Sequence, residues 1–78
     1  MSALNRTLVL NMFIKHETLT LADAAKEENL GVIPDEQHFR YLLEELEESG
    51  YVLQLAGALQ STYTITDKGI AEGERLNG

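Results

Sequence analysis

The first cluster of apolar residues lies near the start of the chain and repeats with helical spacing. One side of a helix over residues 3–16 would carry three of them at intervals of four: Leu4, Leu8 and Met12. Ser2 is placed to cap that helix. The central run LVLNMFI is also short and apolar enough to form a buried strand, so the pattern leaves both structures open, and we favour the helix.

A short extended segment and a second helix are predicted next. Residues 17–20 fit a brief strand, because Thr18 and Thr20 alternate with Leu19 and Leu21. Thr20 and Asp23 then have the spacing of a capping box, in which each side chain can bind a free amide at a helix start. We expect the second helix over residues 21–30, ended by Gly31 in a left-handed conformation.

The third helix has the clearest pattern in the chain. Pro34 and Asp35 open it, and Gly50 closes it. Its apolar residues recur at intervals of three, four and seven: Phe39, Leu42, Leu43 and Leu46. We expect this stripe to form the core together with residues from other elements, namely Leu21, Ile65 and either Leu8 or Met12.

After the third helix the pattern becomes typical of strands. Residues 51–55 and 62–65 are rich in β-branched, aromatic and aliphatic side chains, and residues 56–58 (Ala-Gly-Ala) lie between them as turn material. We expect an antiparallel hairpin whose tip is exposed to solvent. Thr66 is then placed to cap a last short helix over residues 67–76.

Three stretches of the sequence resemble a known fold. They are LTLADAAKEENL (19–30), LLEELEESGYV (42–52) and YTITDKG (63–69). The last is similar to the Y-x-[LI]-T-x-K-G element that ends the wing in bacterial regulators of the MarR and PadR type. With the order helix, strand, helix, helix, hairpin, helix, the whole chain resembles a winged helix-turn-helix domain.

This resemblance implies an α+β fold in a single domain, 1–78. The winged helix would have a three-helix core with a short strand, a β-hairpin wing and a short C-terminal helix. In the family, the third helix enters the DNA major groove, and the wing touches the backbone or the minor groove.

The composition fits one small globular domain and narrows its chemistry. The 78 residues are 44% hydrophobic and 24% charged. Because there is no cysteine, disulfides and thiolate metal sites are excluded, and His16 and His38 lie on different elements, so we expect no metal site. No nucleophile motif, phosphate-binding loop or zinc-binding helix motif occurs, so we expect neither enzyme activity nor a cofactor.

The distribution of charge separates two functions. The net charge is −7, and residues 51–66 contain no charged side chain. The third helix alone carries −5, because its one cation, Arg40, is set against six carboxylates: Asp35, Glu36, Glu44, Glu45, Glu47 and Glu48. DNA affinity depends largely on lysines and arginines at the phosphates. We therefore expect a small acidic protein-interaction module. The alternative is a dimeric transcription regulator that binds DNA through the third helix.

The outward side of the third helix is the predicted binding surface in both cases. Its residues lie opposite or beside the apolar stripe: Gln37, Arg40, Tyr41, Glu44 and Glu48. For the DNA alternative, Gln37 has the side chain to bind adenine, and Arg40 the side chain to bind guanine. Tyr41 is a candidate anchor for a protein partner, since tyrosine is enriched at interfaces.

We expect the chain to self-associate through the apolar residues of the first helix that lie outside the stripe of Leu4, Leu8 and Met12. Residues of the last helix would lie at the border of this interface. The predicted dimer interface is Leu10, Phe13, Ile14, Ile70 and Leu76. A monomer could hide the same residues if the last helix folded back across the first. Gly69 and Gly73 make that close packing possible.

The apolar run at residues 8–14 predicts neither targeting nor anchoring. It is interrupted by Asn11 and is far shorter than the roughly 20 residues of a membrane span. No small-residue cleavage site follows it, so we expect no signal peptide and no membrane association. The lack of cysteine is compatible with a reducing compartment, and we expect the cytoplasm.

Overall fold

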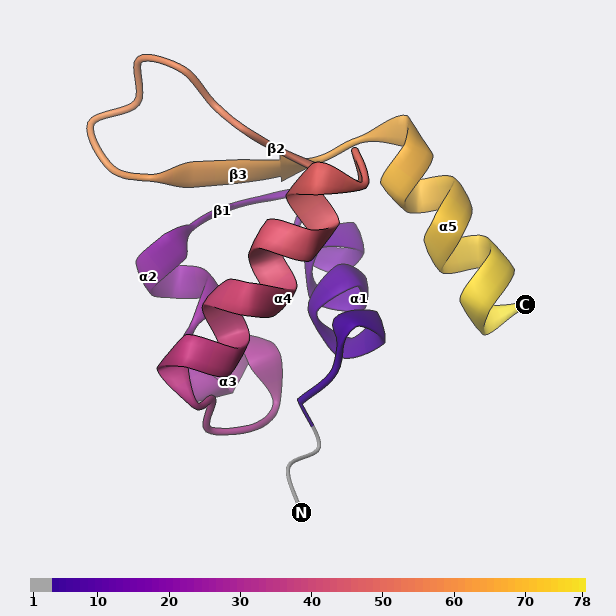
Figure 1. Cartoon of the computed structure of the whole chain (residues 1–78), viewed down its shortest axis with the longest axis horizontal. Helices are drawn as coiled ribbons and strands as arrows, with labels where there is room; N and C mark the ends of the chain where they lie inside the picture. The colour runs from indigo at the N-terminus through magenta and orange to yellow at the C-terminus, as the bar shows by residue number, and fades with distance from the viewer. Residues whose placement is uncertain (1–3) are drawn as a thin grey trace.

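Five helices and a three-stranded antiparallel sheet make up the computed structural model, which describes residues 4–78 (Figure 1). The α+β class expected from the sequence is confirmed. The elements, in chain order, are α1 (Arg6–His16), β1 (Thr18–Thr20), α2 (Leu21–Ala24), α3 (Glu27–Leu30), α4 (Glu36–Glu48), β2 (Val52–Gln54), β3 (Thr62–Ile65) and α5 (Asp67–Asn77).

The apolar run near the start of the chain is a helix, as favoured, but it begins later than expected. Asn5 is the N-cap of α1, and its side-chain oxygen accepts a hydrogen bond from the amide of Leu8 at 2.9 Å. The predicted cap, Ser2, lies outside the described residues. The helix ends at His16, and the positive φ of 68° at its C-cap, Glu17, turns the chain directly into β1.

A single helix over residues 21–30 was the wrong prediction, because two short helices occupy that range. Thr20 caps α2 as expected, accepting from the amide of Asp23 at 3.1 Å. Lys26 then adopts extended backbone angles between α2 and α3. Two side chains hold the end of α2: Asn29 Nδ2 donates to the Asp23 carbonyl at 2.9 Å, and Lys26 Nζ pairs with the Asp23 carboxylate at 2.9 Å. Such local side-chain bonds compete with a continuous helix.

The core forms around the apolar side of α4, as predicted. Phe39, Leu42, Leu43 and Leu46 are all buried, and α1 covers them with Met12. Leu8, Leu21 and Ile65 are half-buried and pack against this cluster from its border.

The sheet order is β1-β3-β2, and both pairings are antiparallel. Alternation along the strands gives the sheet one helix-facing side, which includes Val52 and Tyr63, and one outer side. On the outer side the hydroxyls of Thr18 and Thr64 are hydrogen-bonded at 2.9 Å across β1 and β3. Beyond the strands, residues 55–61 form the hairpin tip and are exposed, as expected.

The last helix folds back onto the first, which corrects the predicted dimer interface. Leu10 and Phe13 have 0% exposure within one chain, so they leave no apolar surface for a second copy. Ile14 is half-buried and contacts α5 at Gly73, while Ile70 and Leu76 lie on the exposed side of α5. The alternative for a monomer, in which the last helix folds back across the first, is therefore the one observed (Figure 1).

Candidate interaction surface

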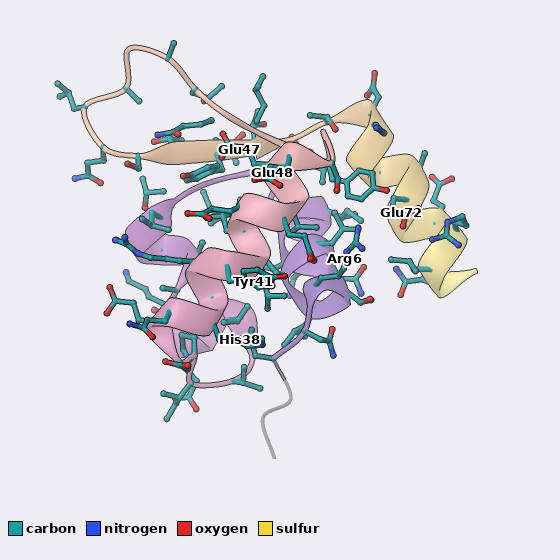
Figure 2. All side chains as sticks on the ribbon, viewed as in Figure 1. Arg6, His38, Tyr41, Glu47, Glu48 and Glu72 are labelled. Atoms are coloured by element: carbon teal, nitrogen blue, oxygen red, sulfur yellow. The ribbon has the colours of Figure 1, made fainter. Side chains whose placement is uncertain are left out.

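The predicted binding residues share the solvent side of α4, which crosses the front of the molecule in Figure 2. All five are exposed: Gln37, Arg40, Tyr41, Glu44 and Glu48. Tyr41 stands near the middle of the helix with 61% of its surface accessible. The geometry follows from the sequence directly, because burying the opposite stripe fixes the rotation of the helix.

A groove runs along one flank of this surface. Its larger part has a volume of about 670 Å³ and lies between α2, the start of α4 and the end of the hairpin tip. The apolar lining is Leu21, Ala22, Ala25, Pro34 and Phe39. A smaller hollow of about 210 Å³ continues it towards Tyr63 and shares Leu21, Arg40 and Ser61 with the first. We refer to both parts together as the α4 groove.

Arg40 lies where the two parts of the α4 groove meet. It is four residues from Glu36 and from Glu44 on the helix, yet it forms no ion pair or hydrogen bond with any described residue. Burial raises the pKa of the Tyr63 phenol beside the groove, and the negative charges of Glu47 and Glu44 raise it further, while Arg40 acts against them. The charged side chains near Tyr63 therefore carry a net negative charge at this end of the groove.

Exposed apolar side chains on the hairpin are a feature that the sequence analysis missed. Leu53 is 56% exposed, Leu55 is 39% exposed, and Leu59 at the tip is fully exposed. The signal was present in the strand alternation, because a buried Val52 places Leu53 and Leu55 on the opposite side of the sheet. With no charged residue in 51–66, this hairpin is an uncharged and partly apolar surface.

A second group of charged residues lies around Tyr51, away from α4's outward side, and Lys68 of α5 belongs to it. Arg6 and Lys68 each stand 5.6 Å from the centre of the Tyr51 ring. Glu72 of α5 accepts two hydrogen bonds from Arg75, at 2.7 and 2.8 Å, and its side chain points towards this group (Figure 2). These contacts are made within the chain, so we assign them to stability.

The histidines are not brought together. His38 Nε2 lies 3.3 Å from the carbonyl oxygen of Leu4, at the entry to α1, whereas His16 ends that helix. Within residues 4–78, no group of three or more His, Asp or Glu side chains is arranged to hold a metal ion. The helices of the same residues are all too short or too polar to cross a bilayer.

No model of a known protein family matches this sequence, and no curated protein is similar to it at a significant level. The two candidate binding surfaces of the chain are therefore those described above, the α4 groove with its acidic helix and the uncharged hairpin.

Proposed function

We propose that this chain is a winged-helix module that binds a protein partner through the outward side of α4 and the α4 groove. The winged-helix assignment is supported by the element order, with β1 leading into α2, α3 and α4 and the β2–β3 hairpin standing as the wing. The observation that carries the functional proposal is the charge of the outward side of α4. It exposes Glu44 and Glu48, with Arg40 as its single cation.

This charge disfavours the alternative function as a DNA-binding regulator. A protein holds DNA largely by neutralising phosphates, and its base contacts specify sequence only once those backbone contacts position it. Gln37 and Arg40 are exposed and chemically able to contact bases. However, α4 presents carboxylates beside them, and the hairpin offers no cation to the backbone.

The chemistry of the surface defines the partner. An acidic helix beside an apolar groove is complementary to a segment that carries lysines or arginines next to apolar side chains. The apolar side chains would enter the groove over Leu21 and Phe39, and the cations would face Glu44 and Glu48. Tyr41 would provide the central contact, because a large exposed aromatic ring gains most from being covered.

The test compares two variants with the same charge change. Glu44→Lys with Glu48→Lys reverses the proposed surface, and Glu27→Lys with Glu28→Lys makes the same change on α3, where both side chains are also exposed. Proteins captured from a lysate of the source cells are compared by quantitative mass spectrometry. We expect a basic protein that the parent and the α3 control capture and that the α4 variant loses at least tenfold. Equal capture by all three chains would contradict the proposal.

A DNA titration completes the test. Fluorescence anisotropy with a mixed duplex at about 50 mM salt detects nonspecific binding even when no operator is known. We expect no salt-sensitive binding at micromolar protein. Micromolar binding that weakens as salt rises, together with its loss on Arg40→Ala, would favour the regulator instead.

A further inference from the structure

The free edge of the sheet is formed by β2. The strand order places β2 at one edge, paired with β3 alone among the strands of residues 4–78. In Figure 1 it lies above β3, with β1 on the other side of β3. An unpaired edge presents backbone donors and acceptors that a further strand can use.

The pairing register shows which backbone groups are free. The amide of Leu55 donates to the carbonyl of Thr62 at 2.8 Å, so these two residues form a hydrogen-bonded pair. Such pairs alternate in an antiparallel ladder, so Leu53 is bonded to Thr64, whereas Gln54 opposite Tyr63 is not bonded to β3. The amide and carbonyl of Gln54 therefore point away from β3, and no described residue binds them.

The edge strand β2 is short, with three residues, but its sequence contains none of the residues that block pairing with another strand. Natural edges are usually blocked by lysine, proline or an inward charge, and residues 51–66 contain none of these. Leu53 and Leu55 instead expose apolar surface on the outer side of the same strand. The edge thus combines free hydrogen-bonding groups with neighbouring side chains that gain from burial.

We propose that a second copy of this chain pairs with β2 in antiparallel orientation, about a twofold axis at Gln54. The two copies of Gln54 would exchange their free backbone hydrogen bonds. Leu53 of each chain would then lie opposite Leu55 of the other, in a non-hydrogen-bonded pair where side chains approach most closely. The two three-stranded sheets would become one continuous sheet, and the outward side of α4 would stay available for a different partner.

The edge is self-complementary, because a twofold axis at Gln54 sets Leu53 of one chain opposite Leu55 of the other, and this favours a second copy as the occupant. In a twofold interface each surface meets itself, so an acidic surface would set carboxylates against carboxylates. Every copy carries −7, and the outward side of α4 is among its acidic surfaces, whereas the hairpin has no charge. The hairpin is therefore a surface on which two copies can meet without repulsion in the contact itself. Because the remaining charges still repel one another, added salt should strengthen the dimer.

Sedimentation velocity of the full chain over a concentration series tests the association. We expect the mass to rise from 8.7 kDa towards twice that value, at lower protein concentration when salt is added. Leu53→Lys and Gln54→Pro should both remove the dimer. The proline replaces an amide that points away from β3, so it breaks no bond of the hairpin. Ile33→Lys changes an apolar residue elsewhere that is more exposed than Leu53, at 78% against 56%, and should leave the dimer intact.

A cysteine scan tests the register, because the chain has no cysteine of its own. Residues in a hydrogen-bonded antiparallel pair have their Cα atoms about 5.5 Å apart, a separation that a disulfide spans. Gln54→Cys should form a disulfide-linked dimer at least tenfold faster than Leu59→Cys at the exposed hairpin tip. A mass of 8.7 kDa at all concentrations and salt levels would overturn the proposal, as would a dimer that keeps its stability in both β2 variants.

Discussion

Gly73 of α5 lies directly against Ile14 of α1, with no space between them for a Cβ atom. One turn earlier, Gly69 lies against the backbone carbonyl of Tyr51 in the same way. These two close approaches let α5 pack on the domain although the helix has few large apolar side chains. Glycine costs a helix about 1 kcal/mol relative to alanine, and here the packing offsets that cost.

The two glycines should respond differently to alanine. At Gly69 the new Cβ would meet backbone of Tyr51 and lie 2.7 Å from Ile65 Cδ1, and backbone cannot move aside. We expect Gly69→Ala to lower the free energy of unfolding by about 3 kcal/mol or more. At Gly73 the obstacle is the flexible end of Ile14, so we expect Gly73→Ala to cost only about 1 kcal/mol after the gain in helix propensity. Urea unfolding measures both values.

A double variant tests whether the contact with Ile14 is what makes alanine unfavourable at residue 73. Ile14→Val removes the Cδ1 atom that obstructs a side chain at residue 73. Gly73→Ala combined with Ile14→Val should therefore be more stable than the sum of the two single changes predicts. Strict additivity would show that the contact between α1 and α5 does not limit residue 73.

Phe13 should behave as a core residue and not as a contact between chains. It is completely buried between α1 and the rest of the domain, so Phe13→Ala should cost about 3 to 5 kcal/mol of unfolding free energy. For a domain of this size that approaches the whole stability. Ile70→Ala, on the exposed side of α5, is the matched control and should cost less than about 1 kcal/mol. Similar melting temperatures for the two variants would contradict the observed packing.

The elements that were predicted well are those whose signals are local. The apolar stripe of α4 and the capping threonines, Thr20 and Thr66, depend on residues within one or two turns of each other, so a pattern in the sequence reports them. The break between α2 and α3 was missed because it depends on specific bonds from Lys26 and Asn29 to Asp23. No periodicity encodes such bonds.

The candidate surfaces also differ in how far the sequence predicts them, depending on whether their residues are close together in the chain. The outward side of α4 follows from its buried side, and all five predicted residues are exposed. The α4 groove joins Leu21, Arg40 and Ser61, which are far apart in the chain, so only the fold brings them together. Burial of Leu10 and Phe13 was likewise unpredictable from α1 alone, because a helix that is apolar on several sides can be covered by its own chain or by another.

Acid should weaken the ion pair that Glu72 makes with Arg75 within α5. Hydrogen bonds from Arg75 hold the pKa of the Glu72 carboxyl below its usual 4.5. Since the folded pKa lies below the unfolded one, the contribution is complete above pH 4.5 and is lost as pH falls through the folded pKa. Glu72→Gln should therefore show a smaller loss of melting temperature than the parent below that pH. Glu74→Gln, which removes a carboxylate without an ion pair among residues 4–78, should follow the parent curve.

Adding cations to the hairpin should test the two features that we propose disfavour DNA binding, namely the lack of cations on the hairpin and the carboxylates of α4. Ala58→Lys with Gln60→Lys changes exposed residues at the tip, so unfolding free energy should stay within about 0.5 kcal/mol of the parent. If only cations were missing, these two changes would produce salt-sensitive binding to duplex DNA at about 50 mM salt. We expect little gain, because Glu44 and Glu48 would still face the phosphates.

Replacing one of those glutamates should then show whether the carboxylates of α4 prevent DNA binding. Adding Glu44→Lys to the two hairpin changes should bring nonspecific binding into the micromolar range, with an affinity that falls steeply as salt rises. The matched control places lysines at Ala71, Leu76 and Glu74 on exposed positions of α5, which reproduces the net charge away from α4. If the control binds DNA equally well, total charge decides the affinity. If only the α4 variant binds, the outward side of α4 has the shape to fit a duplex, and its carboxylates are what keep this chain from DNA.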